Sequence, residues 1–129
     1  MSSELPSREQ AIQLLRENHC SSKVIVHCKA VARVAVETAK ICRRKGLKVD
    51  LDLVEIGAIL HDIGRSKTHS VSHVVVGAEI ARTRGLPKPV VAIIERHVGG
   101  GITGSEAKAL GWPEGEYFPV SLEERRVGG

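Results

Sequence analysis

The stretch Ala58-Ile59-Leu60-His61-Asp62-Ile63-Gly64-Arg65 places an imidazole beside a carboxylate at the end of an apolar run. Burial of such a polar pair is costly unless a partner satisfies both groups, and a divalent cation is a suitable partner. Three other histidines, His27, His73 and His97, lie on separate predicted helices. The pattern indicates a metal site that is assembled across several helices.

The composition is typical of one small domain with an aliphatic core. The chain has 129 residues, of which 42% are hydrophobic but only 2% are aromatic. This length suits a single core, and the scarcity of aromatic residues disfavours sites that stack nucleobases on aromatic side chains. The net charge of +4 suits an anionic ligand but falls short of a dedicated nucleic-acid-binding protein.

The three cysteines, Cys20, Cys28 and Cys42, form no C-x-x-C pair. This spacing argues against a disulfide framework and a zinc ribbon, so we expect reduced thiols. The first residues lack the features of a secretory signal, and no apolar run approaches the ~18 residues of a membrane span. We therefore expect a cytoplasmic protein that does not associate with membranes.

Caps and apolar spacing predict a succession of helices without strands. Ser7-Arg8-Glu9-Gln10 and Thr103-Gly104-Ser105-Glu106 have the sequence of capping boxes. Apolar residues recur every three or four positions from Val24 to Lys45, and Gly46 is placed to end that helix. The predicted helices cover 7–18, 24–45, 50–62 (or from 52), 70–85 (or from 72), 90–97 and 103–110, and another starts at 121. We predict one all-α domain, a bundle of five to seven helices over residues 1–129.

Imidazole and carboxylate ligands together suit several divalent ions. A histidine-rich site with one carboxylate also keeps coordination positions on the ion open for water or substrate. His27 lies on one helical stripe with Val31, Val34, Thr38 and Ile41. It can therefore face inward, whereas Cys28 lies on another face and is not an expected ligand. A lone inward histidine is more often a satisfied core residue, so the metal prediction depends on the whole set.

This ordered set resembles the pattern of the HD-domain metal-dependent phosphohydrolases, in which a histidine precedes a His-Asp pair and a distant aspartate closes the site. His27 and His61-Asp62 match the first three positions, and His61-Asp62-Ile63-Gly64 looks like the HD-I-G variant of the family. His73 and His97 resemble the extra histidines of members that hold two metals. The resemblance covers roughly residues 21–101.

The resemblance implies that His27, His61 and Asp62 bind one divalent ion and that Asp62 bridges to a second ion held by His73 and His97. One or two ions of Mn, Fe, Ni, Co, Zn or Mg are expected. Such a pair can activate a water for attack at phosphorus. The implied function is a phosphomonoesterase or phosphodiesterase acting on a nucleotide or another small phosphorylated compound, with nucleic acid as a less supported partner.

The loop that follows the His-Asp pair contains three candidates for phosphate contacts, Arg65, Lys67 and His69. Arg65 and Lys67 can donate hydrogen bonds to a phosphate, and Arg65 suits a bidentate contact better. His69 lies in the same loop. We expect Asp62, Arg65 and Lys67 to take part in catalysis, and Arg65, Lys67 and His69 to bind substrate. Solvated loop charges are the competing interpretation of the two cations.

The chain departs from the family pattern because no aspartate lies beyond Asp62. Residues 121–127 resemble the start of the late helix that carries the closing aspartate, so we expect a domain without the C-terminal helix or helices of full-length members. Glu123 or Glu124 could substitute, but both suit a helix start. The alternative function is therefore an HD-like module that binds or senses a nucleotide or RNA phosphate without turnover.

Overall fold

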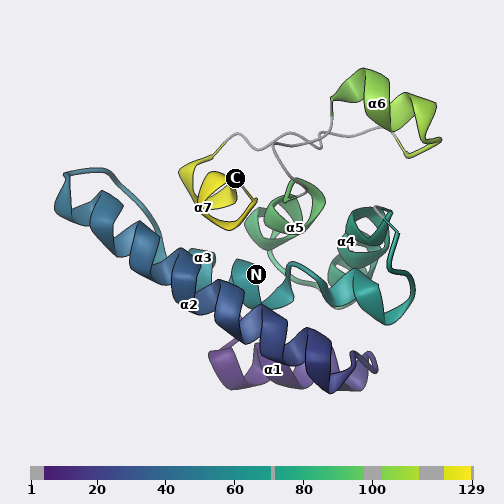
Figure 1. Ribbon diagram of the computed structural model, residues 1–129, viewed down its shortest axis with the longest axis horizontal. Coiled ribbons are helices and arrows are strands. Elements are labelled where there is room, and N and C mark those ends of the chain that lie inside the picture. Colours follow the sequence, from purple (N-terminus) through teal and green to yellow (C-terminus); the bar gives the residue numbers. More distant parts are fainter. Residues whose placement is uncertain (1–4, 71, 98–102, 114–120, 129) are drawn as a thin grey trace.

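The computed structural model describes residues 5–70, 72–97, 103–113 and 121–128. These residues form seven α-helices and one short 3-10 turn, η1, with no strand among them (Figure 1). The elements are α1 (Arg8–Glu17), α2 (Ser22–Arg44), α3 (Leu51–Leu60), η1 (Ile63–Ser66), α4 (His73–Thr83), α5 (Lys88–Glu95), α6 (Gly104–Ala109) and α7 (Leu122–Gly128). The predicted all-α fold is confirmed.

The helix starts follow the predicted capping residues. At α1, the Ser7 hydroxyl accepts a hydrogen bond from the Gln10 backbone N–H, and the Gln10 side chain accepts one from Ser7 N–H. The start of α6 has the same reciprocal pair. Asp50 rather than Asp52 caps α3, since its carboxylate accepts a bond of 3.0 Å from Leu53 N–H. These bonds satisfy backbone donors that a helix start otherwise leaves unpaired.

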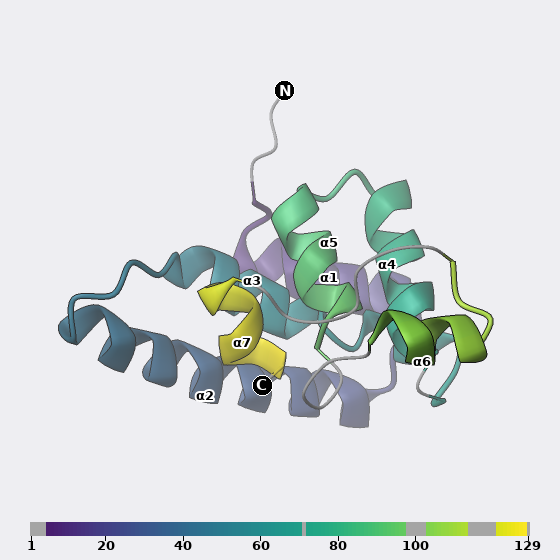
Figure 2. The same ribbon diagram turned by 90° about the horizontal axis from the view of Figure 1, so that it is seen from above.

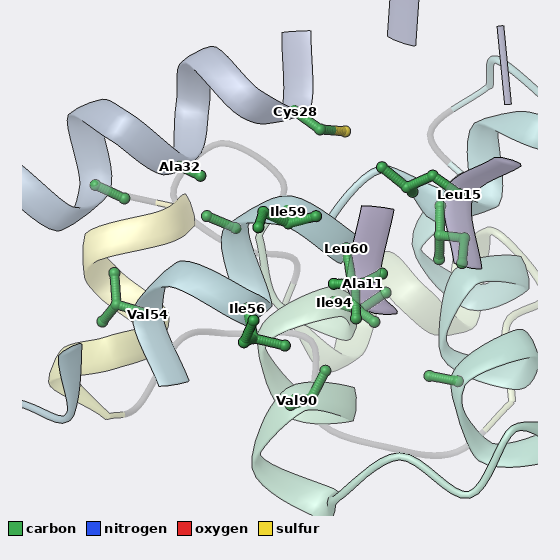
Figure 3. Packing of buried hydrophobic residues seen from close by; sticks show 14 of the residues in the cluster. Ala11, Leu15, Cys28, Ala32, Val54, Ile56, Ile59, Leu60, Val90 and Ile94 are labelled. Carbon is green, nitrogen blue, oxygen red and sulfur yellow. The ribbon is translucent and has the colours of Figure 1, made fainter. Parts of the chain in front are cut away.

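Helix α3 is the centre of the bundle and packs against α1, α2, α5 and α7. Its residues from Ile56 to Leu60 are all buried, and a helix that is buried on every side must be apolar all round. Figure 3 shows the side chains of the neighbouring helices meeting around Ile59 and Leu60. The central position of α3 carries His61 and Asp62, which follow its last residue, into the interior of the protein.

Helix α2 runs along one side of the molecule (Figure 2). The face that it buries is made of small residues. This face consists of Cys28, Ala32, Ala35, Ala39 and Cys42. Small side chains let α2 approach α3 closely, so the bulkier stripe after His27 is turned outward. The apolar spacing from Val24 to Lys45 predicts four of these residues, Cys28, Ala35, Ala39 and Cys42. The stripe of His27, which was expected to be able to face inward, is instead exposed at Val34 (66%) and Ile41 (45%).

Two glycines fix the position of η1 against the start of α4. A Cβ atom at Gly64 would lie 1.9 Å from the backbone oxygen of His73 and 2.7 Å from the backbone nitrogen of Gly77. A Cβ atom at Gly77 would in turn lie 3.2 Å from Gly64 N and 2.9 Å from Ile94 Cγ2. The two backbones approach this closely only because neither residue has a side chain. The contact brings Asp62, which directly precedes η1, next to His73.

The three thiols are free and buried. Burial, followed by the nearby Asp62 carboxylate, raises the pKa of Cys28 to about 12, and the same two causes raise the pKa of Cys20. Because the thiolate is the reactive form, we expect native protein to react with iodoacetamide at least ~100-fold more slowly than unfolded protein. Mass spectrometry after labelling, with denatured protein as the control, measures this. Rapid modification of Cys28 in the native state would contradict the packing of α2 on α3.

Among the described residues, no helix combines the length and the apolar character that a membrane span requires.

Candidate metal centre

Asp62 lies at the meeting point of four histidines that come from different parts of the chain. Its Oδ2 atom is 3.2 Å from His27 Nε2 of α2 and 3.3 Å from His61 Nε2 at the end of α3. Its Oδ1 atom is 3.1 Å from His73 Nε2 of α4 and 3.2 Å from His97 Nε2 after α5. The donor atoms form two groups that share Asp62. We call them the outer group (His27, His61, Asp62) and the inner group (Asp62, His73, His97).

Backbone carbonyls hold three of the imidazole rings. The Nδ1 atom of His61 contacts the Ala58 carbonyl, that of His73 the Ser70 carbonyl at 2.9 Å, and that of His97 the Ile94 carbonyl at 2.7 Å. A carbonyl can only accept a hydrogen bond, so each Nδ1 carries the proton and Nε2 is the atom left to face Asp62. Histidine ligands of metals are commonly oriented in this way.

The inner group has the spacing of ligands on one metal ion. His73 Nε2 and His97 Nε2 are 3.0 Å apart, and each is 3.1–3.2 Å from Asp62 Oδ1. Three donors at about 2.1 Å from one ion in octahedral geometry are separated by about 3.0 Å. Two Nε2 atoms at this separation need a proton or a metal ion between them, because each is otherwise an acceptor. Two histidines and one carboxylate suit a first-row divalent ion.

The protonation states of the site are set by burial and by mutual contacts. The Asp62 side chain is only 4% exposed, and burial acts to raise its pKa. The contacts of the carboxylate with His61, His73 and His97 outweigh this effect and hold the pKa of Asp62 well below its ordinary value. Burial lowers the pKa of His97. An ionised carboxylate and an imidazole that resists protonation are the forms that bind a metal.

A cleft of about 330 Å³ opens beside the outer group and is lined by Lys23, Val24, His27, Asp62 and Arg65. Arg65 Nε is 3.3 Å from Asp62 Oδ2, and Arg65 Nη1 donates a bond of 3.2 Å to the His69 carbonyl. Lys23 was not predicted as a site residue. Its position four residues before His27, on the same face of α2, was the available signal.

The structure separates the two cations that were expected to bind phosphate together. Lys67 is exposed and lines a different groove, next to Asn18 and residues of α4. Lys67 directly follows η1, and the cleft that Arg65 lines does not include it. His69 is exposed, and its contribution near the site is the backbone carbonyl that binds Arg65.

The two glutamates near the end of the chain have other partners. Glu123 Oε2 accepts a bond of 2.9 Å from Asp50 N–H at the start of α3. Glu124 is buried and pairs with Arg96 at 3.0 Å. Neither glutamate belongs to a metal-binding group among the residues that the structure describes. Both glutamates lie in the first turn of α7, as expected, and the contact of Glu123 with α3 was not predicted.

The sequence is similar to those of two relatives over more than nine-tenths of its length. It is 49% identical over 119 residues to an uncharacterized protein of Methanocaldococcus jannaschii, covering 92% of this chain and 70% of the relative. It is 40% identical to the tRNA (cytidine(56)-2'-O)-methyltransferase of Thermoplasma volcanium, covering 95% of this chain. The chain spans about a third of that methyltransferase, with 35% of its length matched.

The fold and the family are shown by two further comparisons. A crystal structure of the L. monocytogenes phosphodiesterase PgpH HD domain superposes with a TM-score of 0.64 at 20% identity, over 92% of this chain and 68% of that chain. The family model of the HD domain matches residues 24–126. This range contains all five residues of the inner and outer groups. The chain belongs to the HD-domain superfamily of metal-dependent phosphohydrolases.

Proposed function

We propose that this protein hydrolyses a phosphate ester of a nucleotide or another small phosphorylated compound, with one or two divalent ions held by His27, His61, Asp62, His73 and His97. The observation that carries the proposal is the shared carboxylate, since Asp62 lies within 3.3 Å of four imidazole Nε2 atoms and borders a cleft. A pair of bound ions would activate a water and neutralise charge on the phosphate.

The cleft supplies the remaining groups for binding a phosphate. Arg65 and Lys23 add two cations to its wall, and the guanidinium of Arg65 can donate two parallel bonds to a phosphate. The His27 side chain is 54% exposed, so the outer group is reachable from solvent. The cleft volume of about 330 Å³ is that of a small-molecule site. These features favour a compact phosphorylated substrate.

A second candidate function is a module that binds or senses the same phosphate without turnover. One observation favours it: Glu123 and Glu124, which could take the place of the closing aspartate of the family pattern, are engaged elsewhere. The name of the methyltransferase relative supports including an RNA 5' or 3' phosphate among the ligands to be tested.

A substrate panel distinguishes the two functions. Metal-reconstituted protein is incubated with p-nitrophenyl phosphate, nucleoside phosphates, cyclic phosphodiesters and short RNA with terminal phosphates. For a phosphohydrolase we expect product that depends on Mn²⁺, and Arg65→Gln should lower kcat/KM by about 10- to 100-fold, because it removes a charged hydrogen bond to the phosphate.

His19→Asn is the matched control, since His19 is exposed, lies outside both groups and has a φ of 65°, which asparagine tolerates. It should retain full activity. Thermal stabilisation by a ligand without product would support the sensing module. If no member of the panel yields product or stabilises the protein, both functions are contradicted.

A further inference from the structure

We propose that the two groups bind metal ions with unequal affinity. The guanidinium of Arg65 contacts the Asp62 oxygen of the weaker site until Arg65 binds a phosphate instead. This inference rests on the proposed function, because it concerns how the same site assembles. It follows from three differences between the inner and outer groups: their closure, the anchoring of their histidines and their contact with a protein cation.

The inner group is closed and pre-organised. Its three donor atoms form a triangle with sides of 3.0–3.2 Å, and its three side chains are between 4% and 8% exposed. The carbonyls of Ser70 and Ile94 hold both rings through Nδ1. An ion entering this group therefore meets ligands that are already in place, and little side-chain entropy is lost on binding.

The outer group is open on the side of His27. The His27 side chain is about half exposed, and no hydrogen bond to its Nδ1 is found among the described residues. A ligand without such a partner must be ordered when the ion binds. Missing outer-shell partners typically weaken metal binding by about 10- to 100-fold. The outer group is thus the weaker site even before other charges are considered.

Arg65 strengthens this difference because it contacts the outer oxygen of Asp62. Its Nε lies 3.3 Å from Oδ2, the atom that also faces His27 and His61 at 3.2 and 3.3 Å. A divalent ion at Oδ2 would be repelled by a guanidinium at this distance. Arg65 must therefore move away before the outer ion binds, and among the described residues its ion pair with Asp62 is to Oδ2 and not to Oδ1.

A phosphate in the cleft offers Arg65 a new anionic partner, since Arg65 lines that cleft. When Arg65 binds the phosphate, Asp62 Oδ2 becomes available to the ion. The outer ion and the phosphate should therefore bind cooperatively, each raising the affinity of the other by the same factor. The two-metal arrangement would be completed only when a phosphorylated ligand is present.

Calorimetric titration of the metal-free full chain with Mn²⁺ tests the inference. We expect one tight ion and a second that binds at least ~10-fold more weakly. Saturating inorganic phosphate should tighten the second ion by about 5- to 150-fold. Arg65→Gln should tighten the second ion without phosphate and abolish the effect of phosphate. Lys67→Gln is the matched control. It also removes a cation that follows the His-Asp pair, but Lys67 lines another groove.

His27→Ala and His73→Ala assign the two ions. His27→Ala should remove only the weaker ion, and His73→Ala should remove the tighter one. Two ions of equal affinity in the native protein, an Arg65→Gln protein with an unchanged second ion, or loss of the tighter ion in His27→Ala would overturn the inference and leave the proposed function intact. Absence of any Mn²⁺ binding would instead contradict the proposed function.

Discussion

Asp62→Asn is expected to abolish metal-dependent stabilisation of the protein, because both groups depend on this one carboxylate. The amide has a single oxygen and no charge, and its NH2 group would face the Nε2 atoms of one histidine pair. An ion present at a thousandfold excess over its Kd stabilises the native state by about 4 kcal/mol. For a domain of this size, that corresponds to an increase in Tm of about 15 °C.

The measurement is a pair of thermal unfolding curves, with and without Mn²⁺, together with the metal content of the purified protein. Asp52→Asn is the matched control, since Asp52 is exposed in the first turn of α3 and belongs to neither group. It should keep the full Mn²⁺ response. If Asp62→Asn kept an undiminished response, Asp62 would not be the shared ligand, and the two-group description of the site would be wrong.

Gly64→Ala should damage the fold and the site together. The added Cβ would lie 1.9 Å from the backbone oxygen of His73, and backbone atoms cannot move aside as the end of a flexible side chain can. We expect the free energy of unfolding to fall by about 3 kcal/mol, at the upper end of overpacking effects. Because η1 would be displaced from α4, the distance between Asp62 and His73 should increase and the inner ion should bind more weakly.

Chemical denaturation and Mn²⁺ titration of the same sample test both effects. Gly85→Ala is the control, because Gly85 has a φ of +72° but no atom lies within 4 Å of the added Cβ. The free energy of unfolding of this variant should fall by about 1 kcal/mol, and its metal affinity should be unchanged. A Gly64→Ala protein as stable as Gly85→Ala, with native metal affinity, would show that the contact of Gly64 with Gly77 does not position the site.

The helices could be predicted because their signals are local. A capping box at Ser7 and the apolar run before His61 involve residues within one or two turns, and the structure has helices at both places. The exposure of the stripe that His27 shares on α2 was harder to predict. The apolar spacing indicates the stripe with Cys28, Ala35, Ala39 and Cys42, which is buried. The adjacent stripe with Val34 and Ile41 is apolar too, and only the packing on α3 leaves it exposed.

The sequence by itself determined the fold class, the family resemblance and the identity of the five candidate ligands, because each depends on residue types in a fixed order. Only the tertiary structure decided which side chains meet. It separated Lys67 from Arg65 and added Lys23 to the cleft. These outcomes depend on close approaches between distant segments, above all Gly64 against the start of α4, and such distances have no signature in local sequence.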